Sequence, residues 1–429
     1  MLRQRRRFAL SIRRGSLSRL IPCALVVVLS AADVSSAGDG DGRRYSLAEI
    51  VALAEQHNPS VSVFQANIAA ARGALTSARA YPNPEVEVEV GKGRPLDSPG
   101  SGYEQERRFG LSQSLEWSGK RAGRTKAADA QVGVAQEALN DFRLELRAEV
   151  KEAFFQTLLA QHIASVVTQN VATARSLVES ARLRVESGEA PELDLIKARV
   201  ELFNVTRDSR RAENRITVAK AALNSLLGGA LDHEFEVVGE PPGPATSYEL
   251  SPLIQQALAR HPLIARQEQA LAAAGYTLSQ ERHARVPDLT IRGSTSEEID
   301  KRSSSIGLAL SVPLLSQRQG EIATARAGEA RAQAELARTR LELTKLITQE
   351  YENYRIAVDQ LTIFEEGLLK QADEALRIAQ FSYQQGELDL LNLLDAQRVQ
   401  RATLLQYYEA RFDLQTALAR LERVTGESP

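Results

Sequence analysis

Hydrophobic and polar residues recur along the chain with two different periods, which predict helices and strands in a fixed order. Residues 47–80 are rich in alanine and place apolar side chains at helical spacing, so they predict a helix. Residues 85–90, Glu-Val-Glu-Val-Glu-Val, then alternate strictly and predict a strand over 85–91 with one polar and one apolar face. After a turn-rich loop, a second alternating stretch over 105–117 predicts a partner strand.

Long helical patterns follow each strand pair. They cover 118–187 and 316–385 without a single proline, and at about 1.5 Å per residue each predicts a helix of about 105 Å. Shorter helical segments over 192–227 and 390–424 return after sharp turns. One opening helix and one return helix together therefore match the length of one long helix.

The second half of the chain repeats the first. The segment from Tyr45 to Pro59 returns from Tyr248 to Pro262. A period of about 200 residues is far longer than the roughly 20 to 50 residues of solenoid repeats, so it indicates duplication of a half-molecule. The first repeat covers 38–227, and the glycine- and proline-rich segment 228–247 predicts a linker. The second repeat, 248–429, predicts helices over 250–283, 316–385 and 390–424 and strands over 288–295 and 304–314.

The first 37 residues differ from the rest of the chain in charge and hydropathy. Seven arginines up to Arg19 precede an apolar run from Leu20 to Ala32, and small residues follow it. The run is shorter than the about 20 residues of a transmembrane helix, so this pattern predicts a secretory signal peptide over 1–37. The only cysteine, Cys23, lies in this segment, and the mature chain is expected to have no thiol or disulfide chemistry.

Composition narrows the possible chemistry. The 429 residues are 43% hydrophobic and 25% charged, which excludes a disordered or collagen-like protein. The five histidines show no i, i+4 pairing, so no metal site is expected. His57 and His261 lie beside prolines at matching places in the repeat, where a role at a helix start is expected instead. We predict no enzyme activity, no cofactor and no nucleic-acid partner.

Four strands of about ten residues are long enough to cross a bilayer when tilted. They cannot close a barrel alone, and open strand edges are not tolerated in lipid. Closure must come from other copies of the chain, for which cyclic assembly is the simple solution. The alternative is a soluble hairpin on a coiled coil, against which the signal peptide and the duplication argue.

The duplicated order of helix, strand pair, long helix, tight turn and helix resembles the TolC-like outer-membrane efflux family over essentially the whole mature chain. The most specific motif is Phe381-Ser382-Tyr383-Gln384-Gln385-Gly386, followed by Asp395. The resemblance implies a mainly α fold with a membrane β-barrel portion. In it a homotrimer forms a twelve-stranded barrel in the outer membrane, continued by a long periplasmic α-helical barrel. It also implies two protein partners, an inner-membrane efflux pump and a periplasmic adaptor (membrane fusion) protein.

The end of the second strand indicates a subgroup. Residues 113–121, Gln-Ser-Leu-Glu-Trp-Ser-Gly-Lys-Arg, resemble the cobalt-zinc-cadmium type of heavy-metal outer-membrane factor. Trp117, Lys120 and Arg121 also have a simpler interpretation as anchors near lipid headgroups. Export of heavy-metal cations is the favoured hypothesis, while drug efflux, type I protein secretion and, less favoured, a periplasmic adaptor or coiled-coil protein stay open.

The alternating strands predict the lining of the channel. If the valines face outer-membrane lipid, Glu85, Glu87 and Glu89 face the lumen, where an acidic wall favours cations. The alternative is that Arg108 and Arg292 neutralise these glutamates across strands, and both interpretations stay open.

The resemblance also implies a channel gate at the periplasmic tip. Asp395 and Tyr383 match the gate aspartate and tyrosine of the family, and Asp194 matches the aspartate of the first-repeat turn. Asn392 replaces the second gate aspartate, and the arginine expected near Leu388 is absent, which puts the family's salt-bridge lock in doubt. The turns expected to contact the adaptor contain Gly188, Glu189, Gly386 and Glu387.

Overall fold

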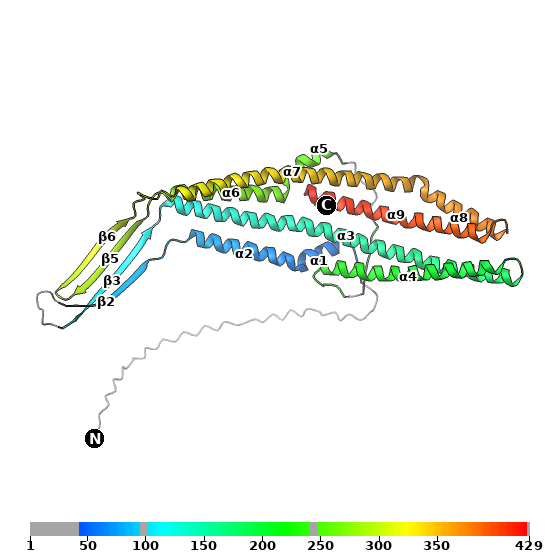
Figure 1. The fold of residues 1–429 in the computed structure, drawn as a ribbon, viewed down its shortest axis with the longest axis horizontal. Coiled ribbons are helices and arrows are strands. Elements are labelled where there is room, and N and C mark those ends of the chain that lie inside the picture. Colours follow the sequence, from blue (N-terminus) through cyan, green and yellow to red (C-terminus); the bar gives the residue numbers. More distant parts are fainter. Residues whose placement is uncertain (1–42, 95–101, 233, 241–247, 427–429) are drawn as a thin grey trace, which may run out of the picture. The chain divides into compact units, whose positions relative to one another are not determined.

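The two halves of the chain fold into similar series of elements (Figure 1). The computed structural model describes residues 43–94, 102–232, 234–240 and 248–426, within the unit Gly42–Pro429, so the predicted signal peptide lies outside the described residues. The first repeat contains α1 (Leu47–His57), α2 (Pro59–Arg79), β2 (Glu85–Gly93), β3 (Glu104–Leu115), α3 (Ser118–Glu186) and α4 (Glu192–Leu226). The second contains α5 (Leu250–Arg260), α6 (Pro262–His283), β5 (Leu289–Glu298), β6 (Lys301–Leu310), α7 (Gln319–Ile363), η1 (Phe364–Leu368), α8 (Leu369–Gln384) and α9 (Leu390–Thr425).

Each opening helix is divided in two, so the prediction of single helices over 47–80 and 250–283 is wrong. The residues after α1 and α5, Asn58 and His261, have extended backbone with ψ of 121° and 131°. A proline follows each of them, and proline disfavours helical backbone in the residue before it. The proline then begins α2 or α6, where its missing N–H has no helical partner to lose.

The long helix differs between the repeats. α3 runs unbroken for 69 residues, about 104 Å at about 1.5 Å per residue. The prediction of one continuous helix over 316–385 is wrong, since α7 begins at Gln319 and the π-helical turn η1 separates it from α8. Within η1, Gly367 has non-helical backbone angles, φ 162° and ψ −16°. None of the described helices combines the length and apolar composition needed to cross a membrane.

The four long strands form one antiparallel sheet in the order β2-β3-β5-β6. Compared with the predicted strands, β2 extends to Gly93, β3 ends at Leu115, β5 extends to Glu298, and β6 begins at Lys301 and ends at Leu310. The pairing of β3 with β5 joins the two repeats. Within the described residues β2 and β6 pair on one side only, so both edges of the sheet carry unpaired backbone groups.

A short second sheet ties the start of the first repeat to the linker. β1 (Arg43–Tyr45) pairs in parallel with β4 (Phe235–Val237), and the Tyr45 and Phe235 rings meet edge to face at 6.3 Å. No strand is predicted in the 228–247 linker, because three residues are too few to show a period. Residues 233 and 241–247 of the linker lie outside the described residues.

The repeats interlock along α3. This helix packs against α2 and α4 of its own repeat and against α6 and α9 of the other. At Gly123 the approach of α6 is so close that an added Cβ atom would lie 2.8 Å from the Gln280 Cβ. The ion pairs that join α3 to the last turns of α9 are Glu145–Arg423, Lys151–Glu422 and Glu152–Arg420.

Each repeat also has its own apolar core. In the first, Ile50, Phe154 and Leu223 are fully buried where α1, α3 and α4 meet. In the second, Leu343 and Leu421 are fully buried where α7 and α9 meet beside α5. Truncating one such leucine to alanine typically costs about 2–5 kcal/mol of stability, so these clusters hold the helices of each repeat together.

Candidate functional site

The sheet presents one apolar and one polar face, as the alternation along the strands dictates. The large apolar side chains of one face are 37% to 89% exposed, namely Val86, Val88, Val90, Phe109, Leu111, Leu115, Leu289, Ile291, Ile306, Leu308 and Leu310. A continuous exposed apolar face on four paired strands marks a surface that contacts lipid or another protein.

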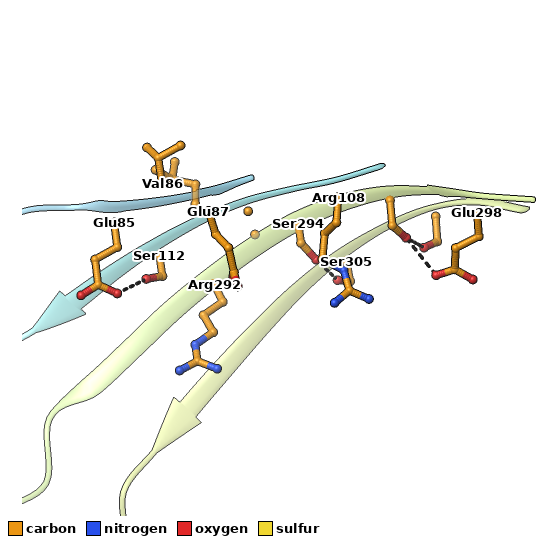
Figure 2. A pocket seen from close by; sticks show the side chains of 14 residues that line it. Glu85, Val86, Glu87, Arg108, Ser112, Arg292, Ser294, Glu298 and Ser305 are labelled. Atoms are coloured by element: carbon orange, nitrogen blue, oxygen red, sulfur yellow. Dashed lines mark hydrogen bonds between the residues drawn. The ribbon is translucent and has the colours of Figure 1, made fainter. Parts of the chain in front are cut away.

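The opposite face is polar and borders a hollow of about 790 Å³ (Figure 2). Glu85, Glu87, Arg108 and Arg292 line it, whereas the Val86 side chain points to the other side of the sheet. The glutamates and the valines of β2 therefore occupy opposite faces.

Opposite charges on the polar face are paired only in part. The Arg108 Nη1 atom lies 3.1 Å from Glu89 Oε2, and these side chains are 51% and 54% exposed, so solvent screening limits the pair to less than about 1 kcal/mol. Ser112 donates a hydrogen bond of 3.4 Å to Glu85. Neither Glu87 nor Arg292 makes an ion pair with any described residue. Among the described residues, an arginine on the neighbouring strand therefore neutralises one of the three glutamates of β2, namely Glu89.

The second hairpin contributes hydroxyl groups to the same face. Ser294 and Ser305 lie opposite each other on β5 and β6 with their Oγ atoms 3.0 Å apart, and Ser296 and Ser303 repeat this arrangement at 2.8 Å. These hydroxyls can exchange hydrogen bonds with water or with a hydrated ion. In the described part of the chain, no three His, Cys, Asp or Glu side chains form a group that could hold a metal ion.

At the junction between strands and helices, the basic residues predicted as lipid anchors make contacts within the chain. Lys120 is only 15% exposed, and its Nζ lies 2.8 Å from Asp288 Oδ1, which also accepts from the Trp117 backbone N–H at 3.2 Å. Arg121 donates to the Arg79 carbonyl at the end of α2. Lys120 and Arg121 are therefore held by contacts within the chain, and of the three residues Trp117, 53% exposed, has the freest side chain.

Arg124 completes this junction and was not singled out from the sequence. Its guanidinium pairs with both Glu116 oxygens and donates to the Ala78 and Ala80 carbonyls at 3.1 and 3.3 Å. A cation at these carbonyls caps the C-terminal end of α2 and interacts favourably with its dipole. Its one sequence signal is its spacing of four residues from Lys120, which places both on one face of α3.

The two turns at the far end of the helices have the same geometry. Gly188 and Gly386 take left-handed φ angles of 75° and 78°. After each glycine, a backbone N–H returns to the preceding helix, from Glu189 to the Arg184 carbonyl at 2.8 Å and from Glu387 to the Ser382 carbonyl at 2.9 Å. This bonding satisfies the last carbonyls of α3 and α8, so each hairpin ends in a tight exposed tip.

The structure separates the predicted gate residues into different environments. Asp395 is exposed and lies 3.3 Å from Arg398, one turn along α9. Asp194 lies 3.8 Å from Lys197 within α4. Asn392 donates through its side chain and its backbone N–H to Asp389, which caps α9, so Asn392 helps to begin this helix.

Tyr383 is buried among apolar residues of both hairpins, and its partner is a residue that the sequence did not indicate. The Arg184 guanidinium lies 5.0 Å from the centre of the Tyr383 ring, and its Nη1 donates to the Tyr383 carbonyl at 3.4 Å. This cation–π contact joins the end of α3 to the end of α8. Arg184 and Tyr383 lie 199 residues apart in the chain, so no local pattern reveals the pair.

Comparison with known proteins gives this architecture a family. Residues 50–229 and 253–427 match the family of outer membrane efflux proteins. The cobalt-zinc-cadmium resistance protein CzcC of Cupriavidus metallidurans is 26% identical over 387 residues, which cover 89% of this chain and 90% of CzcC. The outer membrane protein TolC of Vibrio cholerae is 25% identical over 420 residues, with coverage of 89% and 90%.

The fold agrees with a solved channel. A crystal structure of CusC has a TM-score of 0.77 and 18% sequence identity to this chain, and the match covers 89% of this chain and 92% of CusC. The predicted TolC-like fold and the absence of an enzyme role are confirmed by these matches. The chain belongs to the outer membrane efflux protein family, as a channel of the outer membrane with a periplasmic helical extension.

Proposed function

We propose that three copies of the chain form an outer-membrane duct that exports heavy-metal cations. The observation that carries the proposal is the pair of free edges on β2 and β6 of the described sheet. The strands alternate in direction, so β6 of one copy can continue an antiparallel sheet onto β2 of the next. Three copies then close a twelve-stranded barrel with the apolar face toward lipid and no open edge.

The cation preference follows from the polar face, which becomes the lumen of this barrel. Glu85 and Glu87 have no cationic partner among the described residues and outnumber the unpaired Arg292 on the same face, so assembly multiplies a net negative charge around one lumen. The field of such an acidic wall favours cations, which pass hydrated. The similarity to CzcC over 89% of the chain supports a heavy-metal cargo.

The duct needs partners at its periplasmic end. We assign energy supply to an inner-membrane pump, because the sequence has no phosphate-binding Gly-Lys-Ser/Thr loop. The exposed turns Gly188-Glu189 and Gly386-Glu387 are the surfaces we assign to a periplasmic adaptor protein.

Native mass measurement of the detergent-solubilised protein tests the assembly. We expect a trimer, because a folded monomer would leave both sheet edges unpaired. A species that is folded by circular dichroism and remains monomeric would overturn the proposal.

The cargo is tested in a strain that lacks its own channel and carries this chain with its pump and adaptor. We expect restored tolerance to zinc or cadmium and no change in tolerance to drugs. Restored drug tolerance alone would favour the second candidate, drug efflux, which the similarity to Vibrio cholerae TolC supports.

The gate proposal concerns Asp395, whose three copies would repel at close range and bind a cation in the closed state. Asp395→Ala should lower the block of single-channel current by cations added on the periplasmic side. Arg398→Ala should raise it, because Arg398 lies 3.3 Å from Asp395 and competes with the cation. Glu374→Ala, which removes an acid paired with Arg377 in the same i, i+3 manner, is the matched control. Unchanged block in an intact trimer would show that Asp395 is merely solvated.

A further inference from the structure

In each repeat, one side chain caps the start of a helix, α2 or α6, and also bonds to the end of another helix, α4 or α9. We call this pair of contacts a clamp. In the first repeat this residue is Asn58. Its Oδ1 accepts from the Ser60 backbone N–H at 2.8 Å, and its Nδ2 donates to the Leu226 carbonyl at 2.9 Å. Asn58 therefore joins the start of α2 to the last residue of α4.

His261 makes the same two contacts in the second repeat. Its Nδ1 accepts from the Leu263 backbone N–H at 3.1 Å, and its Nε2 lies 3.1 Å from the Arg423 carbonyl near the end of α9. A backbone N–H can only donate and a carbonyl can only accept, so Nδ1 carries no hydrogen and Nε2 carries one. Both contacts thus require the neutral ring, in one defined tautomer.

We propose that His261 makes the second clamp open in acid, whereas Asn58 keeps the first clamp insensitive to pH. Protonation places a hydrogen on Nδ1, where it faces the Leu263 N–H, so the cap of α6 is lost. The bond from Nε2 to the Arg423 carbonyl can remain. Acid therefore releases the first turn of α6 specifically, and this inference does not depend on the cargo or the assembly of the channel.

The surroundings of His261 set the direction of its response. The charged groups that act on it are Asp141 on α3 and Arg423 on α9. Arg266 on α6 and Glu145 on α3 act in turn on Asp141, and Glu145 pairs with Arg423. Burial is the largest influence and lowers the pKa of His261. The hydrogen bond to the Arg423 carbonyl and the Asp141 carboxylate oppose this shift, while the charge of the Arg423 guanidinium adds to it. The ring is 4% exposed, and a Cβ atom at Gly426 would lie only 3.3 Å from it.

The lowered pKa of His261 determines how the stability of the fold changes with pH. The folded ring has a pKa below the ordinary value of 6.5, so the unfolded chain binds more protons in the interval between the two values. The stability that His261 contributes is present above that interval. It is lost as the pH falls from about 6.5 toward the folded pKa.

Hydrogen exchange of the full chain in detergent, followed by mass spectrometry, tests the proposal. The peptide after Pro262 reports the second clamp, and the peptide after Pro59 is an internal control with the same intrinsic dependence of exchange on pH. As the pH is lowered in steps from about 7.5 through about 6.5 and below, the exchange rate of the first turn of α6, relative to that of α2, should rise about fivefold once the ring is protonated, the effect of losing one helix cap.

Two substitutions, each of which places the clamp residue of one repeat in the other, complete the test. His261→Asn installs the residue that the first repeat already uses, and it should keep the ratio constant with pH. Asn58→His should transfer the acid response to α2. A constant ratio in the native chain, or a ratio that still rises in folded His261→Asn, would overturn the proposal.

Discussion

The two β-hairpins share one backbone plan and differ in the chemistry of their polar face. β2 and β3 carry Glu85, Glu87 and the Glu89–Arg108 pair, whereas β5 and β6 carry Arg292 and serines that bond to one another across the strands. On the apolar face the two hairpins are alike, with valine, leucine, isoleucine and phenylalanine side chains. The apolar face is therefore common to both copies of the hairpin, whereas the polar face differs between them.

The helices show the same kind of divergence. α3 is unbroken, whereas η1 divides the corresponding helix of the second repeat. Beyond η1, the α8–α9 hairpin contacts the first repeat through an apolar cluster, through Arg184 on Tyr383 and through an ion pair of 3.1 Å between Glu201 and Arg401. The α8–α9 hairpin can therefore move relative to the unbroken α3, because a π-helical turn is a place where a helix can bend.

The largest effect should come from a charge on the apolar face. Val88→Arg and Leu308→Arg should each destabilise the protein in vesicles by about 2–4 kcal/mol, the cost of arginine near the middle of a bilayer. Urea unfolding measures this cost, and Glu87→Lys on the polar face is the control with a small expected effect. A large difference in the free energy of unfolding between Val88→Arg and Leu308→Arg would show that the two hairpins are not equivalent.

Glycine-to-alanine substitutions after α4 and after α9 should have smaller effects on stability, and these should differ between the two sites. Gly228 and Gly426 both have left-handed backbone, with φ of 66° and 75°, so alanine at either site costs about 1–2 kcal/mol. At Gly228 the new Cβ would also overlap the His57 carbonyl oxygen, whereas at Gly426 it would lie 3.3 Å from a His261 ring atom. Gly228→Ala should therefore unfold at lower urea concentration than Gly426→Ala, and the reverse order would contradict this packing.

The divergence of the polar faces predicts a change in selectivity without a change in stability. Glu85→Gln with Glu87→Gln should lower the preference of the open channel for cations over anions, measured as a reversal potential in planar bilayers, because the lumen loses charge. Ser294→Ala with Ser305→Ala changes the second hairpin at matching depth and should leave the reversal potential unchanged. Equal shifts from both double variants would show that charge on the first hairpin does not set selectivity.

The smallest effect concerns the link between the two tips. A double-mutant cycle of Arg184→Ala with Tyr383→Leu should give a coupling energy of about 0.5–1 kcal/mol, as expected for a partly exposed cation–π contact. Arg182 pairs with Glu179 and Glu186 inside α3, so Arg182→Ala in place of Arg184→Ala should give a coupling near zero.

Elements with a sustained period could be predicted from the sequence, and contacts between distant segments could not. The strands and the unbroken α3 follow from alternation and from the absence of proline. The role of His261 at a helix start was predicted and is confirmed, whereas for His57 it was wrong, because His57 ends α1 and Asn58 caps the next helix.

The rest depends on tertiary structure. Arg124 reaches the carbonyls at the end of α2, and Arg184 reaches Tyr383, only when helices from different parts of the chain meet, so local spacing alone does not identify either contact. η1 replaces a stretch of ordinary helical composition, and its one local sign, Gly367, is too common in helices to locate a break.

The interlocking of the repeats along α3 has a consequence for biosynthesis. Two neighbours of this helix, α6 and α9, belong to the half of the chain that is translated last. Until they arrive, one flank of α3 has no partner, so the first repeat cannot complete its fold as an independent nascent domain. A chaperone that accompanies the emerging chain would have this long flank to shield, because the internal duplication produced two halves that mature only together.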